Sequence, residues 1–125
     1  MNISRNFMLI GALFLLIGIA MGMFMGGSGD HTFAPVHAHI NLVGFTLMTI
    51  FGLTYRLIPA MASGMLARLH FWLHALGTTV MVVLLYLLFS GGLAEDSGLF
   101  LVMPIAEMSV FLGAILFAWS LYQSA

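Results

Sequence analysis

The chain has 125 residues, of which 62% are hydrophobic and only 6% are charged, and its formal net charge is -1. A soluble domain carries about 25% charged residues, so this composition excludes a water-soluble fold, and its high apolarity is the reverse of the disordered signature. With no lysine and no cysteine, the sequence argues against a nucleic-acid partner and excludes disulfides and cysteine-ligated metals. We therefore expect an integral membrane protein whose environment is the lipid bilayer.

Four segments are long and apolar enough to cross a membrane, which requires roughly 20 mostly apolar residues. They lie at residues 7–25, 36–58, 67–89 and 99–122. The apolar runs are continuous rather than alternating, which excludes a β-barrel. The sequence thus predicts an all-α fold, a four-helix membrane bundle that forms a single domain over residues 1–125.

The first predicted span carries a stripe of glycines, at residues 11, 18, 22 and 26. Such stripes let helices approach closely in lipid, and we favour packing within the chain over contact between copies. The apolar run is too long for a signal peptide, and no clean cleavage site follows it, so we expect the segment to be retained.

The connection after the first span suggests copper as one alternative. Met21, Met23 and Met25 lead into Asp30 and His31, and soft thioethers suit Cu(I). However, only the first and last of these methionines share a helix face, and methionine commonly fills apolar gaps. We expect His31 itself to be solvated in the loop.

The charged residues predict an orientation. All three arginines can lie on one side of the membrane: Arg5, Arg56 and Arg68. The loops on the other side hold Asp30, Glu95 and Asp96. The positive-inside rule then places both termini in the cytoplasm, and we expect a prokaryotic inner membrane. An aromatic belt is expected near the same face, formed by Tyr55, Trp72, Trp119 and Tyr122.

The three prolines predict helix boundaries. Pro35 suits a first helical position, where its missing N–H costs nothing. Pro59 is expected to close the second helix. Pro104 either kinks the fourth helix, by leaving the Phe100 carbonyl unpaired, or marks a later helix start.

Histidines are the most informative residues, because an ionisable group inside a membrane is a functional hypothesis by default. His37 and His39 open the second span and point to nearly opposite sides, so they cannot share one ion but can serve two sites. We favour ligation for this pair, because two neighbouring buried imidazoles are costly without ligands. His70 and His74 share a face and could chelate one ion, but we favour hydrogen bonds to a neighbouring helix.

Depth argues against a site that combines the two pairs. His39 is expected about 5 Å below the outer end of its helix, and His74 about 10 Å above the inner end of the next. In a hydrocarbon core of about 30 Å, this leaves a vertical gap of roughly 15 Å.

Two consecutive segments resemble a known family. The run HAHINLVG at residues 37–44, continued by GLTYRLIP at 52–59, resembles the tenth helix of subunit I of the haem–copper oxidases. It is most similar to the nitric oxide reductase and cbb3-type branches. The run LHFWL at residues 69–73, up to Gly77, resembles the start of the eleventh helix. The resemblance implies that His37 and His39 are haem ligands, whereas His70 is structural.

The family has twelve helices in three arcs of four, and this chain has the size of one arc. The resemblance implies a b-type haem protein that assembles as a homotrimer, with His37 of one chain and His39 of the next binding one haem. Its role would be electron transfer or redox or gas sensing, with an unidentified redox partner. No Cys-x-x-Cys-His motif is present, which excludes covalent c-type haem.

Several expectations accompany this hypothesis. Gly44 and Gly52 are expected to leave room for the porphyrin, and His31, Thr32 and Asn41 are the nearby candidate donors for its propionates. Glu107, about 12 Å below the outer end of its helix, is a proton carrier or a neutral acid bonded to a neighbouring helix. No catalytic set is complete within one chain, so enzyme activity stays open. A cofactor-free accessory subunit of a respiratory complex is the remaining alternative.

Overall fold

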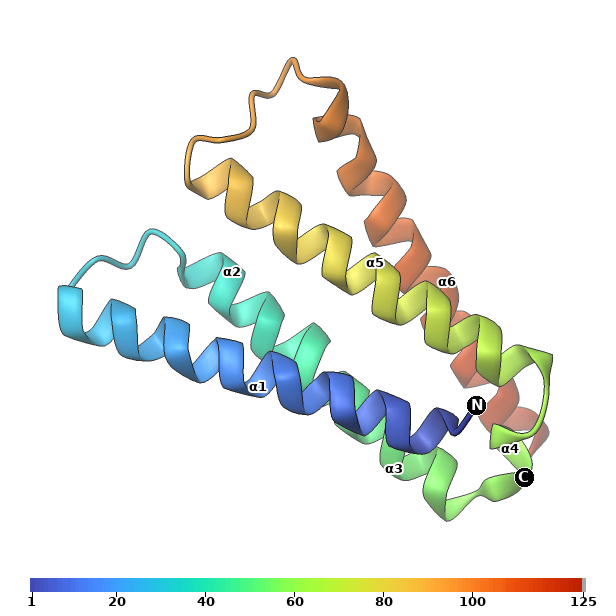
Figure 1. Ribbon diagram of the computed structural model, residues 1–125. Coiled ribbons are helices and arrows are strands. Elements are labelled where there is room, and N and C mark those ends of the chain that lie inside the picture. The colour runs from blue at the N-terminus through green and yellow to red at the C-terminus, as the bar shows by residue number, and fades with distance from the viewer. Residues whose placement is uncertain (125) are drawn as a thin grey trace.

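The computed structural model describes residues 1–124 and is built from helices (Figure 1). In chain order these are α1 (Ile3–Ser28), α2 (Ala34–His39), the π-helical η1 (Ile40–Thr46), α3 (Leu47–Leu57), α4 (Pro59–Ala62), α5 (Met65–Phe89), the 3-10 helix η2 (Gly98–Leu101) and α6 (Val102–Gln123). Since α2, η1 and α3 form one continuous helix, four helices are long and apolar enough to cross a membrane. The predicted all-α fold is confirmed, and no strand occurs in residues 1–124.

The long helices form two hairpins. The first pairs α1 with the continuous α2–η1–α3 helix, and the second pairs α5 with α6 (Figure 1). The start of α1, the short α4 and the end of α6 all lie at one end of the bundle (Figure 1). The loops that hold Asp30, Glu95 and Asp96 lie at the opposite end, so the arginines and the acidic loops are separated as predicted.

The glycines of α1 allow this close approach of the first hairpin. A Cβ on Gly11 would lie 3.3 Å from the Met48 Cβ, and one on Gly22 would lie 3.0 Å from the His37 Cε1. A Cβ on Gly18 would overlap the Asn41 side chain. Packing within the chain is therefore confirmed for these three glycines. It is wrong for Gly26, which has nothing within 4 Å, because the register places it opposite the loop before α2.

Atoms of α1 occupy the space beside the glycines of the second helix. A Cβ on Gly44 would lie 2.5 Å from the Phe14 Cγ, and one on Gly52 would lie 2.9 Å from the Ser4 carbonyl oxygen. The expectation that these glycines leave room for a porphyrin is therefore wrong, because the neighbouring helix occupies the space above both.

The prolines lie at helix starts and ends. Pro35 is in the first turn of α2, and α3 ends at Leu57, before Pro59 begins α4. Pro104 lies in the first turn of α6, where its missing N–H breaks no helical hydrogen bond. Of the two expectations for Pro104, the later helix start is therefore the correct one.

An aromatic core joins the two hairpins. Phe7 of α1 and Phe51 of α3 are 0% and 5% exposed, and the Phe51 ring lies 4.5 Å from the His70 ring, centroid to centroid. Tyr55 belongs to this core, because it is only 1% exposed. Its predicted place in an aromatic belt is therefore wrong, whereas Trp72, Trp119 and Tyr122 are exposed at 51%, 52% and 74%.

Candidate functional site

His39 lies half-buried at the end of α2, with one ring nitrogen fixed and the other free. Its Nδ1 is 2.7 Å from the Pro35 carbonyl oxygen, one turn earlier. A carbonyl only accepts hydrogen bonds, so Nδ1 carries the proton and Nε2 carries the lone pair. No hydrogen bond to Nε2 occurs within residues 1–124. Metal-ligating histidines are usually held in this way, with the second nitrogen donating to a carbonyl or carboxylate.

The free nitrogen of His39 lies on the outward face of the second helix. The same face carries Leu42, Ile50 and Leu53, which are 60%, 47% and 47% exposed. It is the face that the chain leaves uncovered. A ligand bound to Nε2 would therefore lie outside this chain's own bundle.

His37 points toward α1, with its ring against Gly22. The Asn41 Nδ2 lies 3.1 Å from the His37 Nε2 and donates to it, while Nδ1 is buried without a partner in the described chain. The two histidines therefore face different sides, as their spacing predicts. Of the pair, only His39 presents a free nitrogen outward, and ligation by His37 requires its ring to turn away from Asn41.

His74 bonds across to the second helix at the π-helical segment. In η1, the Leu47 N–H reaches the carbonyls of Leu42 and Gly44 and passes over that of Val43. The His74 Nε2 lies 2.9 Å from the Val43 oxygen and donates to it. A main-chain carbonyl that the Leu47 N–H does not reach thus accepts a hydrogen bond from a side chain of α5.

His70 makes the second buried connection between these helices. Its Nδ1 lies 2.8 Å from the Tyr55 hydroxyl, and both residues are almost fully buried. The rings of His70 and His74 are 6.0 Å apart, each with a separate partner on the second helix. The expected hydrogen bonds to a neighbouring helix are confirmed. No group of three or more His, Cys, Asp or Glu side chains that could hold a metal occurs in the described part of the chain.

The predicted vertical gap between His39 and His74 is too large. The carbonyl that His74 contacts belongs to Val43, one turn past His39, so the two levels differ by about 5 Å. A gap of that size requires the ends of the two helices to lie at the same level. In the structure, Val43 lies more turns from Leu57, where its helix ends, than His74 lies from Met65, where α5 begins. The second helix therefore extends further than α5 at the arginine-bearing end.

The remaining predicted residues lie apart from this site. His31 is exposed in the loop, as expected, with Nδ1 3.1 Å from the Gly29 carbonyl oxygen. Glu107 is also exposed, on α6. A Cβ on Gly77 would lie 3.0 Å from the Ala106 oxygen, which places Glu107 about one turn beyond His74 and so near the level of His39. Met25 is 5% exposed and Met23 is 71% exposed, so these sulfurs face different sides.

Two partners of the histidines were not assigned that role from the sequence. Asn41 lies one turn after His37, so its spacing could have indicated the contact. Tyr55 lies on another helix from His70, and no spacing within the sequence indicates that they meet.

Comparisons with family models, with curated proteins and with solved structures find no match for this chain.

Proposed function

We propose that the chain is a membrane b-type haem protein in which His39 supplies an axial ligand to the iron. The observation that carries the proposal is the hydrogen bond from the His39 Nδ1 to the Pro35 carbonyl at 2.7 Å, which leaves Nε2 free on the outward face. An imidazole that faces lipid without a partner is costly, and binding of a ligand to its free nitrogen would remove that cost. The resemblance of residues 37–59 to a haem-binding helix supports the same assignment.

The position of His39 implies that haem would lie between chains. Its Nε2 faces away from the bundle, and Gly44 and Gly52 are filled from within, so one chain provides no internal space for a porphyrin at these positions. We therefore propose a homo-oligomer. Because the chain has the size of one of the three four-helix arcs of the family, we propose a trimer. His37 of the neighbouring copy would be the second ligand.

The second ligand requires a rearrangement of His37. Its ring would leave Gly22 and release the hydrogen bond from Asn41, at 3.1 Å. The present orientation leaves Nδ1 buried without a partner, which costs about 1–3 kcal/mol for a neutral polar group. This cost offsets part of the free energy needed to turn the ring.

The haem, when bound, would supply one-electron chemistry, or gas binding if the sixth position is open. The chain's own residues would bind and orient it: the Pro35 carbonyl fixes the tautomer of His39 and the apolar outward face excludes water. A haem held in this way favours a role in electron transfer, or in sensing of redox state or of a gas. In this proposal the arginine-bearing end faces the cytoplasm of a prokaryotic cell, so that the haem lies near the outer face of the inner membrane.

The test is the absorption spectrum of detergent-purified protein from haem-replete cells, with a pyridine haemochrome assay. We expect a reducible Soret band that His39→Ala abolishes. The matched control is His31→Ala, in the exposed loop, which keeps the band. Circular dichroism of each variant separates loss of haem from loss of fold.

Three results would contradict the proposal. Full haem content in His39→Ala would remove its assigned ligand. Colourless wild-type protein that binds added copper would favour a copper-handling role. Colourless protein that binds no metal and co-purifies with larger subunits would favour a cofactor-free accessory subunit of a respiratory complex.

A further inference from the structure

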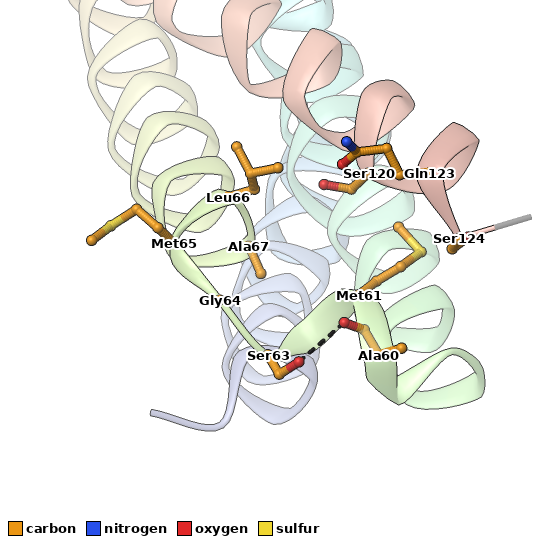
Figure 2. A pocket seen from close by; sticks show the side chains of 10 residues that line it. All are labelled: Ala60, Met61, Ser63, Gly64, Met65, Leu66, Ala67, Ser120, Gln123 and Ser124. Atoms are coloured by element: carbon orange, nitrogen blue, oxygen red, sulfur yellow. Dashed lines mark hydrogen bonds between the residues drawn. The ribbon is translucent and has the colours of Figure 1, made fainter.

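A cavity of about 390 Å³ lies at the arginine-bearing end of the bundle. It is bounded by the loop that contains α4, the start of α5 and the end of α6 (Figure 2). Because α5 begins there as a membrane span, the cavity lies at the level expected for lipid head groups. The histidines described above do not line it.

The start of α5 directs main-chain N–H groups into this cavity. The cap residue Gly64 has φ 145° and ψ 178°, a conformation open essentially only to glycine, and no side chain caps the helix. The first main-chain bond closing the helix is long, at 3.5 Å from the Arg68 nitrogen to the Gly64 oxygen. The N–H groups of residues 65–67, which line the cavity, thus have no acceptor within the helix. The aligned peptide dipoles add partial positive charge at this point.

A serine on the opposite wall independently offers a hydroxyl to a polar ligand. Ser120 of α6 is only 7% exposed, lines the cavity and has no side-chain hydrogen bond within residues 1–124. Figure 2 shows its hydroxyl pointing from α6 toward the start of α5. Gln123, one turn later, adds an amide to the same wall. The hydroxyl is therefore available to a group that enters the cavity.

The charges favour an anion. No charged side chain of either sign lines the cavity, so no carboxylate opposes the partial positive charge at the start of α5. The three arginines of the chain, including Arg68 in the first turn of α5, lie at this end, whereas Asp30, Glu95 and Asp96 lie at the other.

We propose that the start of α5, together with Ser120 and Gln123, forms a binding site for a phosphate group, carried by a phospholipid head group or free in solution. The tetrahedral oxygens would accept from the N–H groups of α5, from the Ser120 hydroxyl and from the Gln123 amide. This site is independent of the haem proposal, because it lies at the other end of the bundle and uses none of the same residues.

The test is binding to detergent-purified protein, with inorganic phosphate and phosphatidylglycerol as the two phosphate probes and a phosphate-free galactolipid as reference. Native mass spectrometry measures retained lipid, and thermal shift measures phosphate. Gln123→Glu places a carboxylate at the cavity wall on an exposed residue and should weaken binding about tenfold by repulsion and lost donation. Ser120→Ala should weaken it by a smaller factor. The control is Ser90→Ala, an exposed hydroxyl at the other end of α5.

Selective retention of phosphatidylglycerol that Gln123→Glu and Ser120→Ala reduce would support the site with a lipid as its source. Stabilisation by inorganic phosphate, without preference among lipids, would support it with free phosphate as the source. Equal retention of the phosphate-free lipid with no effect of phosphate, or equal binding by wild type and folded Gln123→Glu, would overturn the proposal.

Discussion

His37 and His39 differ in which ring nitrogen is left free. The sequence could predict that they face opposite sides, because residues two apart in a helix differ by about 200°. It could not predict the free nitrogen, which depends on the acceptor or donor that each ring meets. That partner is the Pro35 carbonyl for His39 and the Asn41 amide for His37. Candidate ligands can therefore be predicted from the sequence, whereas only the structure distinguishes how they are held.

The bond between Tyr55 and His70 is expected to contribute to stability. Tyr55→Phe removes the hydroxyl that lies 2.8 Å from the His70 Nδ1 and leaves that nitrogen without its partner. We expect the free energy of unfolding to fall by about 1 kcal/mol. Reversible unfolding in mixed micelles measures it, with Tyr122→Phe, at a position 74% exposed, as the control. Equal stability of Tyr55→Phe and the control would contradict the assigned role.

The outer loop contains a carboxylate with a lowered pKa. The Thr32 hydroxyl and N–H, at 2.6 and 3.0 Å, donate to Asp30 and lower the pKa of its carboxyl, with a smaller contribution from His31. Because the folded pKa lies below the unfolded one, this contact contributes above the unfolded pKa and is lost as the pH falls through the folded pKa.

Thr32→Ala removes the larger of these effects, the side-chain hydrogen bond. We expect the pKa of Asp30 to rise toward its ordinary value, measured by carboxyl NMR titration of the purified protein. A midpoint unchanged from wild type would show that the threonine hydroxyl does not hold the carboxylate.

Among the helices, the π-helical segment is the feature that sequence patterns did not predict. The second span was expected as a regular helix over 36–58, and hydropathy alone does not distinguish the two forms. In this π-helix the Leu47 N–H passes over the Val43 carbonyl, which accepts a hydrogen bond from elsewhere in the fold. The donor is His74, on the next hairpin.

The glycine stripe of α1 leads to a paired prediction. Gly18→Ala places a methyl group onto Asn41, so it should lower the free energy of unfolding by about 1–3 kcal/mol. Gly26→Ala meets nothing within 4 Å and should leave stability unchanged or raise it by up to about 1 kcal/mol, because alanine favours the helix. Unfolding of both variants in the same micelles provides the measurement, and an equal loss in the two would contradict the packing described for α1.

For the whole molecule, hydropathy was sufficient to predict four spans and an all-α fold. The stagger of the hairpins was not predictable, because it depends on the turn at α4 and on side chains that meet across helices. The burial of Tyr55 and the cavity beside Ser120 depend on the same tertiary arrangement. Sequence spacing indicates which residues share a helix face, whereas the partner of that face is a property of the assembled chain.

In the proposed assembly, haem lies between copies of this chain and binds His39. The most direct measurement of this arrangement is the mass of the detergent-solubilised, pigmented particle together with its ratio of haem to chain. We expect a homo-oligomer with about one haem per chain, since each interface contributes one His39. A pigmented particle that contains only a single chain, or an oligomer without haem from haem-replete cells, would contradict it.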